Sequence, residues 1–231
     1  MRVYAAGITP TEVIWYPTSH TKSGGKRAAA VPSHEFSGEI AELGEGIEEL
    51  PAGRQVFGMN DWFADGALAE YCITRPEWIA SKPSHLSDAE AASVPIGALT
   101  AWQGLFDRAN LQPGERVLIH GGAGAVGVFA VQLAHSKGAH VITTVSARNS
   151  EFIKGLGAHE TIDYKAVPFE NIARDIDVVF DTVGGETLDR SWNVLRSGGR
   201  LVTIAASQSA NKAFLLVEAN HEQLVEIAKR I

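Results

Sequence analysis

The sequence predicts an α/β fold in two parts: an irregular β-rich lobe over residues 1–95 and a doubly wound parallel sheet over residues 96–231. Up to about residue 95, short extended runs alternate with turn residues, as in the segments 53–58 and 66–74. After the turn at residues 112–115, buried strands alternate with helices, which is the pattern of a parallel sheet covered on both faces. A chain of 231 residues with 45% hydrophobic composition can bury the cores of two such domains.

The expected strands of the second part are residues 116–120, 140–146, 161–164, 176–182, 200–206 and 213–218. A helix over 125–137 ends at Gly138, and a helix over 186–195 presents one apolar face made by Leu188, Trp192 and Leu195. The last helix is capped by Asn220, with Gln223 three residues on, and carries an apolar stripe of Leu224, Ile227, Ala228 and Ile231. Residues 95–106 are apolar enough for a helix buried at a domain interface, where a cleft would be the natural ligand site.

The strand expected at residues 213–218 is the last of the sheet and is apolar for an edge strand. Unprotected apolar edges invite pairing with another chain. The sequence therefore predicts a homodimer that joins at this edge.

Charge and cysteine content narrow the class of partner. With 20 Lys and Arg against 27 Asp and Glu, the formal charge is -7, which argues against a nucleic acid or an anionic membrane as partner and favours a small-molecule ligand. Cys72 is the single cysteine, so no disulfide within the chain and no cysteine-rich zinc site can form, and a reducing compartment is expected. Because the chain shows neither the apolar core of a signal peptide nor a run long enough to span a membrane, we expect a soluble, cytoplasmic protein.

A glycine-rich turn carries the clearest functional signal. The expected strand 116–120 leads into residues 121–127 and then into an apolar helix, so that the pattern GxGxxG falls on Gly122, Gly124 and Gly127. This order of strand, turn and helix is what a Rossmann dinucleotide site requires: positive φ in the turn, close approach to a pyrophosphate, tight helix packing, and a helix N-terminus for the phosphates. We expect cofactor contacts from Gly122, Ala123, Gly124, Ala125, Val126 and Gly127. The alternative is a glycine-rich turn without a ligand.

The end of the second strand of this part indicates which dinucleotide binds. An NAD site usually offers a carboxylate to the adenine ribose there. This chain offers Ser146 and Arg148, which can bind a 2′-phosphate, so NADPH is the expected cofactor. Lys154 and Tyr164 could complete the pocket, or they could be an ordinary surface lysine and an ordinary strand-end tyrosine.

Several runs together resemble a known family: HGGAGAVG at 120–127, AVQLAHSKGAHVI at 130–142, LGAHETIDY at 156–164, VVFDTVGG at 178–185 and GALAEY at 66–71. They are similar to the medium-chain dehydrogenase/reductase superfamily, and within it to the zinc-free quinone oxidoreductases, the zeta-crystallin-like branch. The resemblance covers nearly the whole chain and implies a GroES-like catalytic lobe followed by a Rossmann domain. Family members carry a further β-hairpin before the equivalent of residues 2–7 and continue beyond the equivalent of Ile231, so the sequence is expected to be incomplete at both ends, with a loop also missing within 206–212.

The resemblance implies further cofactor contacts. Thr100 would lie near the nicotinamide, Val183 and Gly184 would flank its ribose, and Ala205 and Ala206 would present backbone groups to the carboxamide. The alternative for Thr100 is a helix hydroxyl bonded to its own preceding turn. The alternative for Asp181, which ends the preceding strand, is a cap on the next turn.

The motif His34-Glu35 raises the question of a metal. Zinc-dependent relatives place a cysteine at the position of Thr9 and a histidine at that of His34, but a neutral threonine hydroxyl is a poor zinc ligand. We therefore expect no metal, and we expect Cys72 to be a small buried hydrophobic residue. His34 then either holds its turn through backbone contacts or faces the acceptor as a donor.

Without a metal that lowers a hydroxyl pKa, alcohol oxidation is hard, and reduction of an electron-poor acceptor is easier. The resemblance and this argument predict an NADPH-dependent reductase of quinones or α,β-unsaturated carbonyl compounds. Candidates to line the acceptor cleft are Thr9, Trp15, Tyr16, Asp61, Trp62 and Phe63, with the Tyr16 hydroxyl as donor; the aromatic side chains could instead be core packing. A non-catalytic NADPH-binding sensor or partner-binding module is the alternative from another class, and a zinc alcohol dehydrogenase is a third.

Overall fold

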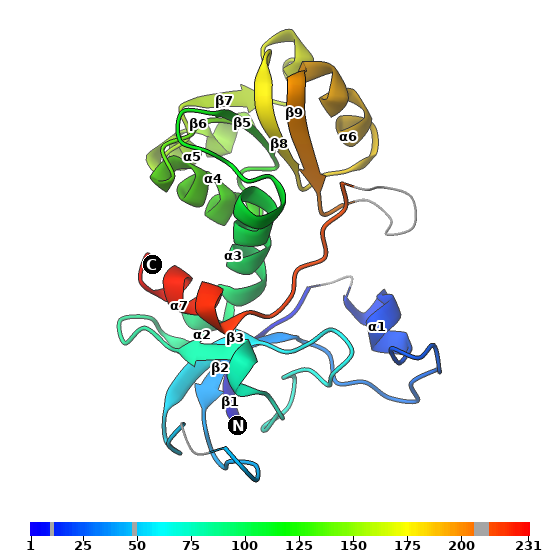
Figure 1. Ribbon diagram of the computed structural model, residues 1–231, viewed down its shortest axis with the longest axis vertical. Helices are drawn as coiled ribbons and strands as arrows, with labels where there is room; N and C mark the ends of the chain where they lie inside the picture. The colour runs from blue at the N-terminus through cyan, green and yellow to red at the C-terminus, as the bar shows by residue number, and fades with distance from the viewer. Residues whose placement is uncertain (10–11, 48–49, 206–212) are drawn as a thin grey trace. The chain divides into compact units, whose positions relative to one another are not determined.

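The computed structural model describes residues 1–9, 12–47, 50–205 and 213–231 (Figure 1). The chain divides into two compact units: unit 1 comprises residues 1–99 and 218–231, and unit 2 comprises residues 100–217. The helix α3 (Pro95–Trp102) runs across the division in the chain and continues as a π-helical turn at Gln103–Arg108. Among the described residues, no helix is long and apolar enough to cross a membrane.

Unit 1 is built on a four-stranded antiparallel sheet in the order β1-β2-β3-β4. The strands are β1 (Arg2–Gly7), β2 (Glu35–Glu39), β3 (Gln55–Met59) and β4 (Ile79–Ser81). Its core contains Phe36, Val56, Ile79 and the buried Cys72. The β-rich lobe predicted from the sequence is confirmed. The predicted extended run at 66–74, however, forms no strand in the described residues; a β-bridge joins its Tyr71 to Arg2.

The helices of unit 1 are short: α1 (Tyr16–Ser19), α2 (Asp88–Ala92) and α7 (His221–Ala228), with 3₁₀ turns at Glu12–Ile14 and Pro76–Trp78. As predicted, the Asn220 side chain caps α7 by accepting the N–H of Gln223 at 3.0 Å. Leu224 and Ile227 are buried, whereas Ile231 is 36% exposed. Because α7 packs against β4, it belongs to unit 1, although the sequence placed it with the dinucleotide-binding part.

Unit 2 is a five-stranded parallel sheet in the order β7-β6-β5-β8-β9, which is the doubly wound arrangement that the sequence predicted. The strands are β5 (Arg116–His120), β6 (His140–Val145), β7 (Glu160–Asp163), β8 (Ile176–Asp181) and β9 (Leu195–Thr203). The helices are α4 (Gly127–Ser136), α5 (Ser150–Gly155) and α6 (Gly185–Ser191). Successive residues of β5 alternate between two cores: Val117 and Ile119 pack with α4 and α5, and Leu118 packs with α6.

Two predictions about the end of the sheet were wrong. The helix expected over 186–195 ends at Ser191, a 3₁₀ turn follows, and β9 begins at Leu195, which leaves Trp192 51% exposed. Residues 213–218 form no strand: only Phe214 pairs, in an isolated parallel bridge to Thr203. An apolar run does not form a strand when its backbone pairs with a neighbouring strand at a single residue. The predicted homodimer therefore lacks the strand on which it was based and stays a prediction, and the loop expected within 206–212 lies outside the described residues.

Candidate cofactor and acceptor site

The glycine turn joins β5 to α4 at close quarters. A Cβ atom on Gly122 would lie 2.1 Å from Thr143 Oγ1, and one on Gly127 would lie 2.1 Å from the carbonyl oxygen of Gly121. Both positions therefore require glycine, as the motif predicted. The positive φ falls on Gly121, at 75°, one residue before the motif.

This turn holds free backbone donors. Within the described residues, the N–H groups of Ala123, Ala125 and Val126 have no backbone or side-chain acceptor. They precede the first turn of α4, a helix of 10 residues, whose N-terminal end carries a positive partial charge. Free donors beside a helix N-terminus, on a backbone that glycine keeps open, fit a pyrophosphate.

A hollow of about 640 Å³ opens beside this turn, at the carboxyl edge of the parallel strands. Residues from the ends of four strands and from α6 line it: His120, Gly121, Thr144, Tyr164, Lys165, Ala166, Val167, Pro168, Phe169, Val183, Thr187 and Arg190. Tyr164 and Val183 were predicted from the sequence. The others were missed, because only the strand order brings the segments that follow β5, β6, β7 and β8 to one edge.

The turn after β8 is held by a buried carboxylate. Asp181, which is fully buried, accepts the N–H groups of Val183 and Gly184 at 3.1 Å and the hydroxyl of Thr203 at 2.7 Å. Gly184 has a φ of 77°, and a Cβ atom there would lie 2.7 Å from the carbonyl oxygen of Ala205. The structure thus brings the predicted Val183, Gly184 and Ala205 together. It supports a turn-capping role for Asp181.

The residues expected around a 2′-phosphate follow two neighbouring strands. Ser146 comes directly after β6 and is half-buried, and Arg148 is exposed in the 3₁₀ turn Ala147–Asn149. Tyr164 follows β7 and is 58% exposed. Lys154, on α5, pairs with Glu151 at 3.0 Å, so part of its charge is already engaged. Of the two remaining predicted contacts, Thr100 is buried in α3, and Ala206 lies outside the described residues.

In unit 1, the structure gathers Trp15, His34 and Trp62 into one aromatic cluster. The Trp15 and Trp62 rings meet edge to face at 5.1 Å between centroids, and the His34 ring lies 5.1 Å from Trp62. His34 Nδ1 contacts the buried Glu12 carboxylate, which also accepts the Ser33 N–H at 2.7 Å. His34 Nε2 is buried and has no hydrogen-bond partner among the residues that the structure describes. The Glu12 side chain therefore ties Nδ1 of His34 to the turn, where the sequence analysis expected backbone contacts, and Nε2 is a buried atom of a side chain that is 1% exposed.

The other residues expected in the acceptor cleft make local contacts. Tyr16 is 55% exposed and its ring stacks on His20 at 4.4 Å. Asp61 Oδ1 accepts the N–H of Phe63 at 2.9 Å, which fixes a turn. The carbonyl oxygen of Thr9 accepts the N–H of Glu12 at 2.9 Å.

The candidate metal ligands of unit 1 do not fit a zinc ion. Thr9 presents a hydroxyl where a thiolate would be needed, and burial raises the pKa of the Cys72 thiol to about 11. Glu35 lies beside His34, but burial raises the pKa of its carboxyl to about 7, and Oε2 already accepts the N–H of Ile96 at 2.9 Å. Nowhere in the described part of the chain do three His, Cys, Asp or Glu side chains converge in a way that could hold a metal.

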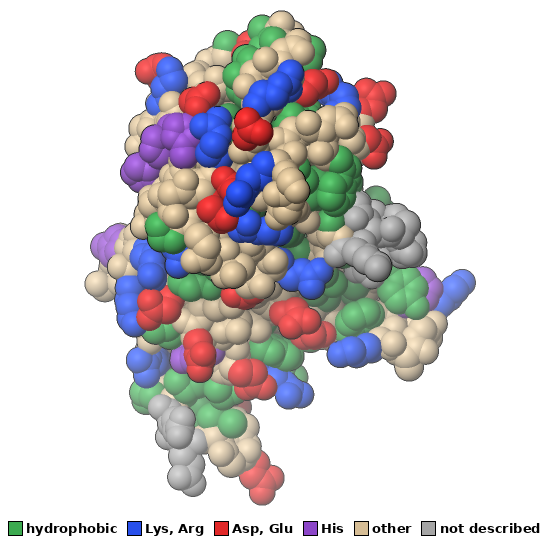
Figure 2. All heavy atoms as spheres, turned by 45° about the horizontal axis from the view of Figure 1, so that its top comes forward, with side chains coloured by type: hydrophobic (Ala, Val, Ile, Leu, Met, Phe, Trp, Pro, Cys, Tyr) green, Lys and Arg blue, Asp and Glu red, His purple; other side chains and the backbone are tan. Residues whose placement is uncertain are grey.

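A histidine group lies at the opposite, amino edge of the unit 2 sheet, and Figure 2 shows histidine side chains gathered on the surface. The ring of His159 lies 4.6 Å from that of His140 and 5.4 Å from that of His135. Partial burial, and then the two neighbouring histidines, lower the pKa of His159. His140 Nε2 bonds to Glu160 at 2.7 Å.

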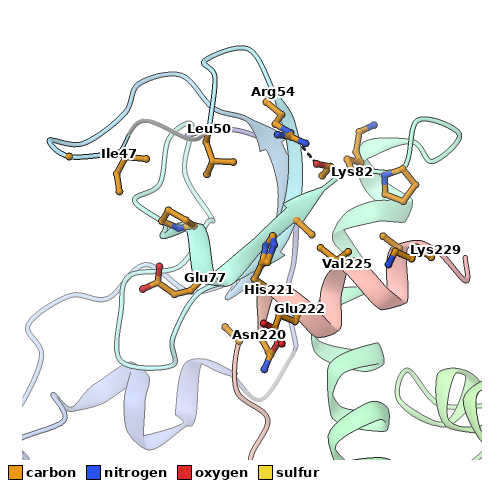
Figure 3. A pocket seen from close by; sticks show the side chains of 17 residues that line it. Ile47, Leu50, Arg54, Glu77, Lys82, Asn220, His221, Glu222, Val225 and Lys229 are labelled. Carbon is orange, nitrogen blue, oxygen red and sulfur yellow. Dashed lines mark hydrogen bonds between the residues drawn. The ribbon is translucent and has the colours of Figure 1, made fainter.

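A second, larger hollow of about 1330 Å³ lies in unit 1, where β4 and α7 line it together with Gly46, Ile47, Leu50 and Arg54 (Figure 3). None of the predicted site residues lines it. Its charges are mixed: the cations are Arg54, Lys82 and Lys229, and the carboxylates are Glu77 and Glu222. It therefore offers no selective field for a charged ligand.

Comparisons with known proteins agree with both units. The family model described as alcohol dehydrogenase GroES-like domain matches residues 1–84, and the one described as zinc-binding dehydrogenase matches residues 125–226. A solved quinone oxidoreductase from Coxiella burnetii is 33% identical, with a TM-score of 0.87 over 99% of this chain and 76% of that one.

Two curated plant proteins are also similar. A 2-methylene-furan-3-one reductase from Solanum lycopersicum is 35% identical over 206 residues, which are 85% of this chain and 52% of the relative. A chloroplastic NADPH-dependent alkenal/one oxidoreductase from Arabidopsis thaliana is 31% identical over 205 residues, again 85% of this chain and 52% of the relative. The chain thus spans about half the length of these curated relatives. It belongs to the medium-chain dehydrogenase/reductase superfamily, in its quinone oxidoreductase branch.

Proposed function

We propose that the protein is an NADPH-dependent, metal-independent reductase of quinones or α,β-unsaturated carbonyl compounds. The observation that carries the proposal is the glycine turn: free N–H groups at Ala123, Ala125 and Val126 open beside a hollow at the carboxyl edge of the sheet. That edge is where doubly wound sheets bind dinucleotides. In this proposal the residues of the turn bind the pyrophosphate, and the hollow takes the adenosine half.

The proposal names NADPH because no carboxylate follows β6, where NAD sites usually place one. Ser146 and Arg148 stand there instead, and Tyr164 follows the neighbouring strand β7. A guanidinium with a hydroxyl suits a 2′-phosphate. The name of the Arabidopsis relative, which is NADPH-dependent, supports the same choice.

The acceptor class follows from the unit 1 cluster and from the missing zinc donors. The half-buried Trp15, against which the buried Trp62 packs, offers aromatic surface to a flat acceptor, and Thr9 replaces a thiolate. When bound, the reduced nicotinamide supplies the hydride. The chain's part is to align the acceptor, to exclude water and to stabilise the charge that develops on its oxygen. Both plant relatives carry names of enone or alkenal reductases, which supports this class.

His34 and Tyr16 are the proposed donors to that oxygen. Within the described part of the chain His34 Nε2 has no hydrogen-bond partner, and Glu12 holds the ring through Nδ1. Tyr16 is exposed and reaches no carboxylate or carbonyl in the described residues. Thr100, Val183, Gly184, Ala205 and Ala206 remain proposed nicotinamide contacts.

The proposal includes a cytoplasmic location and a homodimer that joins at the edge of unit 2 beside β9. Only one bridge, between Thr203 and Phe214, covers that edge in the described residues, which leaves backbone groups of β9 for a partner strand. Light scattering on the purified chain measures the mass; a monomer at all concentrations would count against the dimer.

One steady-state panel tests the activity. NADPH or NADH is combined with a quinone or with an enone, and NADP⁺ is combined with an alcohol. Each assay is run with and without a strong chelator. The proposal predicts oxidation of NADPH that requires the quinone or the enone and survives the chelator. Loss of activity in the chelator, or turnover of the alcohol, would contradict it. Tight NADPH binding without turnover of any acceptor would favour a non-catalytic sensor.

A further inference from the structure

His120, the last residue of β5, is a fully buried polar side chain directly before the glycine turn. Its ring packs edge-on against Phe169, with centroids 4.5 Å apart, and both residues line the unit 2 hollow. Both ring nitrogens have hydroxyl partners: Nδ1 lies 3.2 Å from Thr144 Oγ1, and Nε2 lies 3.0 Å from Ser191 Oγ.

The contacts at the two ends of this network fix the direction of its hydrogen bonds. The Ser191 hydroxyl donates to the carbonyl oxygen of Thr187 at 2.6 Å, so its oxygen must accept from His120 Nε2–H. A neutral imidazole that carries its proton on Nε2 has a lone pair on Nδ1, which accepts from the Thr144 hydroxyl. Thr144 Oγ1 in turn accepts the N–H of Gly121 at 3.2 Å.

These hydrogen bonds form one continuous chain, from Gly121 through Thr144, His120 and Ser191 to the carbonyl oxygen of Thr187. Its first member is the residue with positive φ at which the glycine turn begins, and its last lies on α6 and lines the hollow. Thr144 also accepts the Gly122 N–H through its carbonyl oxygen, at 3.1 Å. Two successive N–H groups of the turn are therefore held by this threonine alone.

We propose that His120 is a positioning residue of the glycine turn at residues 121–127: its Nδ1 orients the Thr144 hydroxyl, which fixes the Gly121 N–H and so presets the turn for the pyrophosphate. This rests on the proposed cofactor binding. The hydroxyl of Thr144 could otherwise rotate away from Gly121, and a turn that is ordered only on binding binds more weakly. Nothing in the glycine motif itself specifies this residue.

Two substitutions separate the two nitrogens. In His120→Asn the side-chain amide oxygen can take the place of Nδ1 and accept from Thr144, whereas in His120→Gln the amide nitrogen can take the place of Nε2 and donate to Ser191. We expect the NADPH dissociation constant, measured by fluorescence titration at neutral pH, to stay within about threefold of wild type for H120N and to rise about tenfold for H120Q. His140→Gln is the matched control, because His140 lies at the opposite edge of the sheet. It should bind as wild type.

A second readout does not depend on the cofactor. Amide hydrogen exchange of Gly121 in the free protein should be faster in H120Q than in H120N, since only H120Q loses the partner of Thr144. Urea midpoints of both variants show how far each is destabilised. A purely structural role would weaken binding in proportion to those midpoints, and equal dissociation constants for H120N and H120Q would overturn the inference. If wild type itself binds no NADPH, the proposed function fails and the inference fails with it; equal losses in variants of a binding wild type overturn the inference alone.

Discussion

The substitution Gly127→Ala tests how closely α4 packs on the glycine turn at residues 121–127. A Cβ atom at this position would lie 2.1 Å from the Gly121 carbonyl oxygen and 2.7 Å from the Gly122 Cα, and both are backbone atoms that cannot swing aside. Cβ contacts essentially never fall below 3.0 Å, so the first turn of α4 must retreat from the turn by about 1 Å.

Such overpacking costs about 1–3 kcal/mol, and the better helix propensity of alanine returns at most about 1 kcal/mol. We expect a net loss of about 1–2 kcal/mol in the free energy of unfolding, read from urea titration. The same retreat displaces the N–H groups of Ala125 and Val126. Loss of one hydrogen bond to a charged phosphate should raise the NADPH dissociation constant about tenfold or more.

Gly155→Ala is the matched control. Gly155 ends α5, and a Cβ atom there would meet no heavy atom within 4 Å. This variant should bind NADPH as wild type and be equally stable or more stable by up to about 1 kcal/mol. Wild-type affinity and stability in G127A would contradict the close packing of α4 on the glycine turn.

Three further predictions concern buried titratable groups. Asp181→Asn turns an amide donor toward the N–H groups of Val183 and Gly184, so the urea midpoint should fall by the equivalent of about 1–3 kcal/mol. Burial raises the pKa of Glu35 to about 7, so its contribution to stability is full below pH 4.5 and is lost as the pH rises through 7; Glu35→Gln should raise the urea midpoint at pH 8 and change it little at pH 5. Burial lowers the pKa of His120 to about 4, so its contribution is full above pH 6.5 and falls by about 3 kcal/mol toward pH 4, a slope that H120N should lack.

An unchanged midpoint in D181N would mean that the turn does not depend on the carboxylate. Equal effects of E35Q at both pH values would show that the pKa of Glu35 is the same in the folded and the unfolded chain. Parallel stability curves for H120N and wild type between pH 6.5 and pH 4 would show that the imidazole is protonated in the folded chain as readily as in the unfolded one.

Much of unit 2 follows from the sequence because buried parallel strands read as continuous apolar runs. The prediction for 116–120 matches β5 (Arg116–His120), and those for β6, β7 and β8 differ by single residues at their ends. The beginning of β9 was missed because Gly198 and Gly199 resemble a break, although the strand runs through them with an irregular register. The return of α7 to unit 1 is a contact between distant parts of the chain, which no local pattern encodes.

The candidate site divides in the same way. The glycine turn is local in sequence, so the motif located it, and Val183 and Gly184 came with the resemblance. His120, Thr144 and Arg190 were missed because they meet only through the pairing of β5 with β6 and β8. The Glu12–His34 contact joins residues 22 apart, so the sequence left both roles of His34 open.

In the proposed function, this chain directs hydride from NADPH to an electron-poor carbon without a metal. The most direct measurement uses NADPH that carries deuterium at the transferred position, an enone acceptor and a strong chelator, with mass spectrometry of the product. We expect a saturated ketone that holds one deuterium at the carbon β to the carbonyl. Bound cofactor with no labelled product, or labelled product only when the chelator is left out, would contradict it.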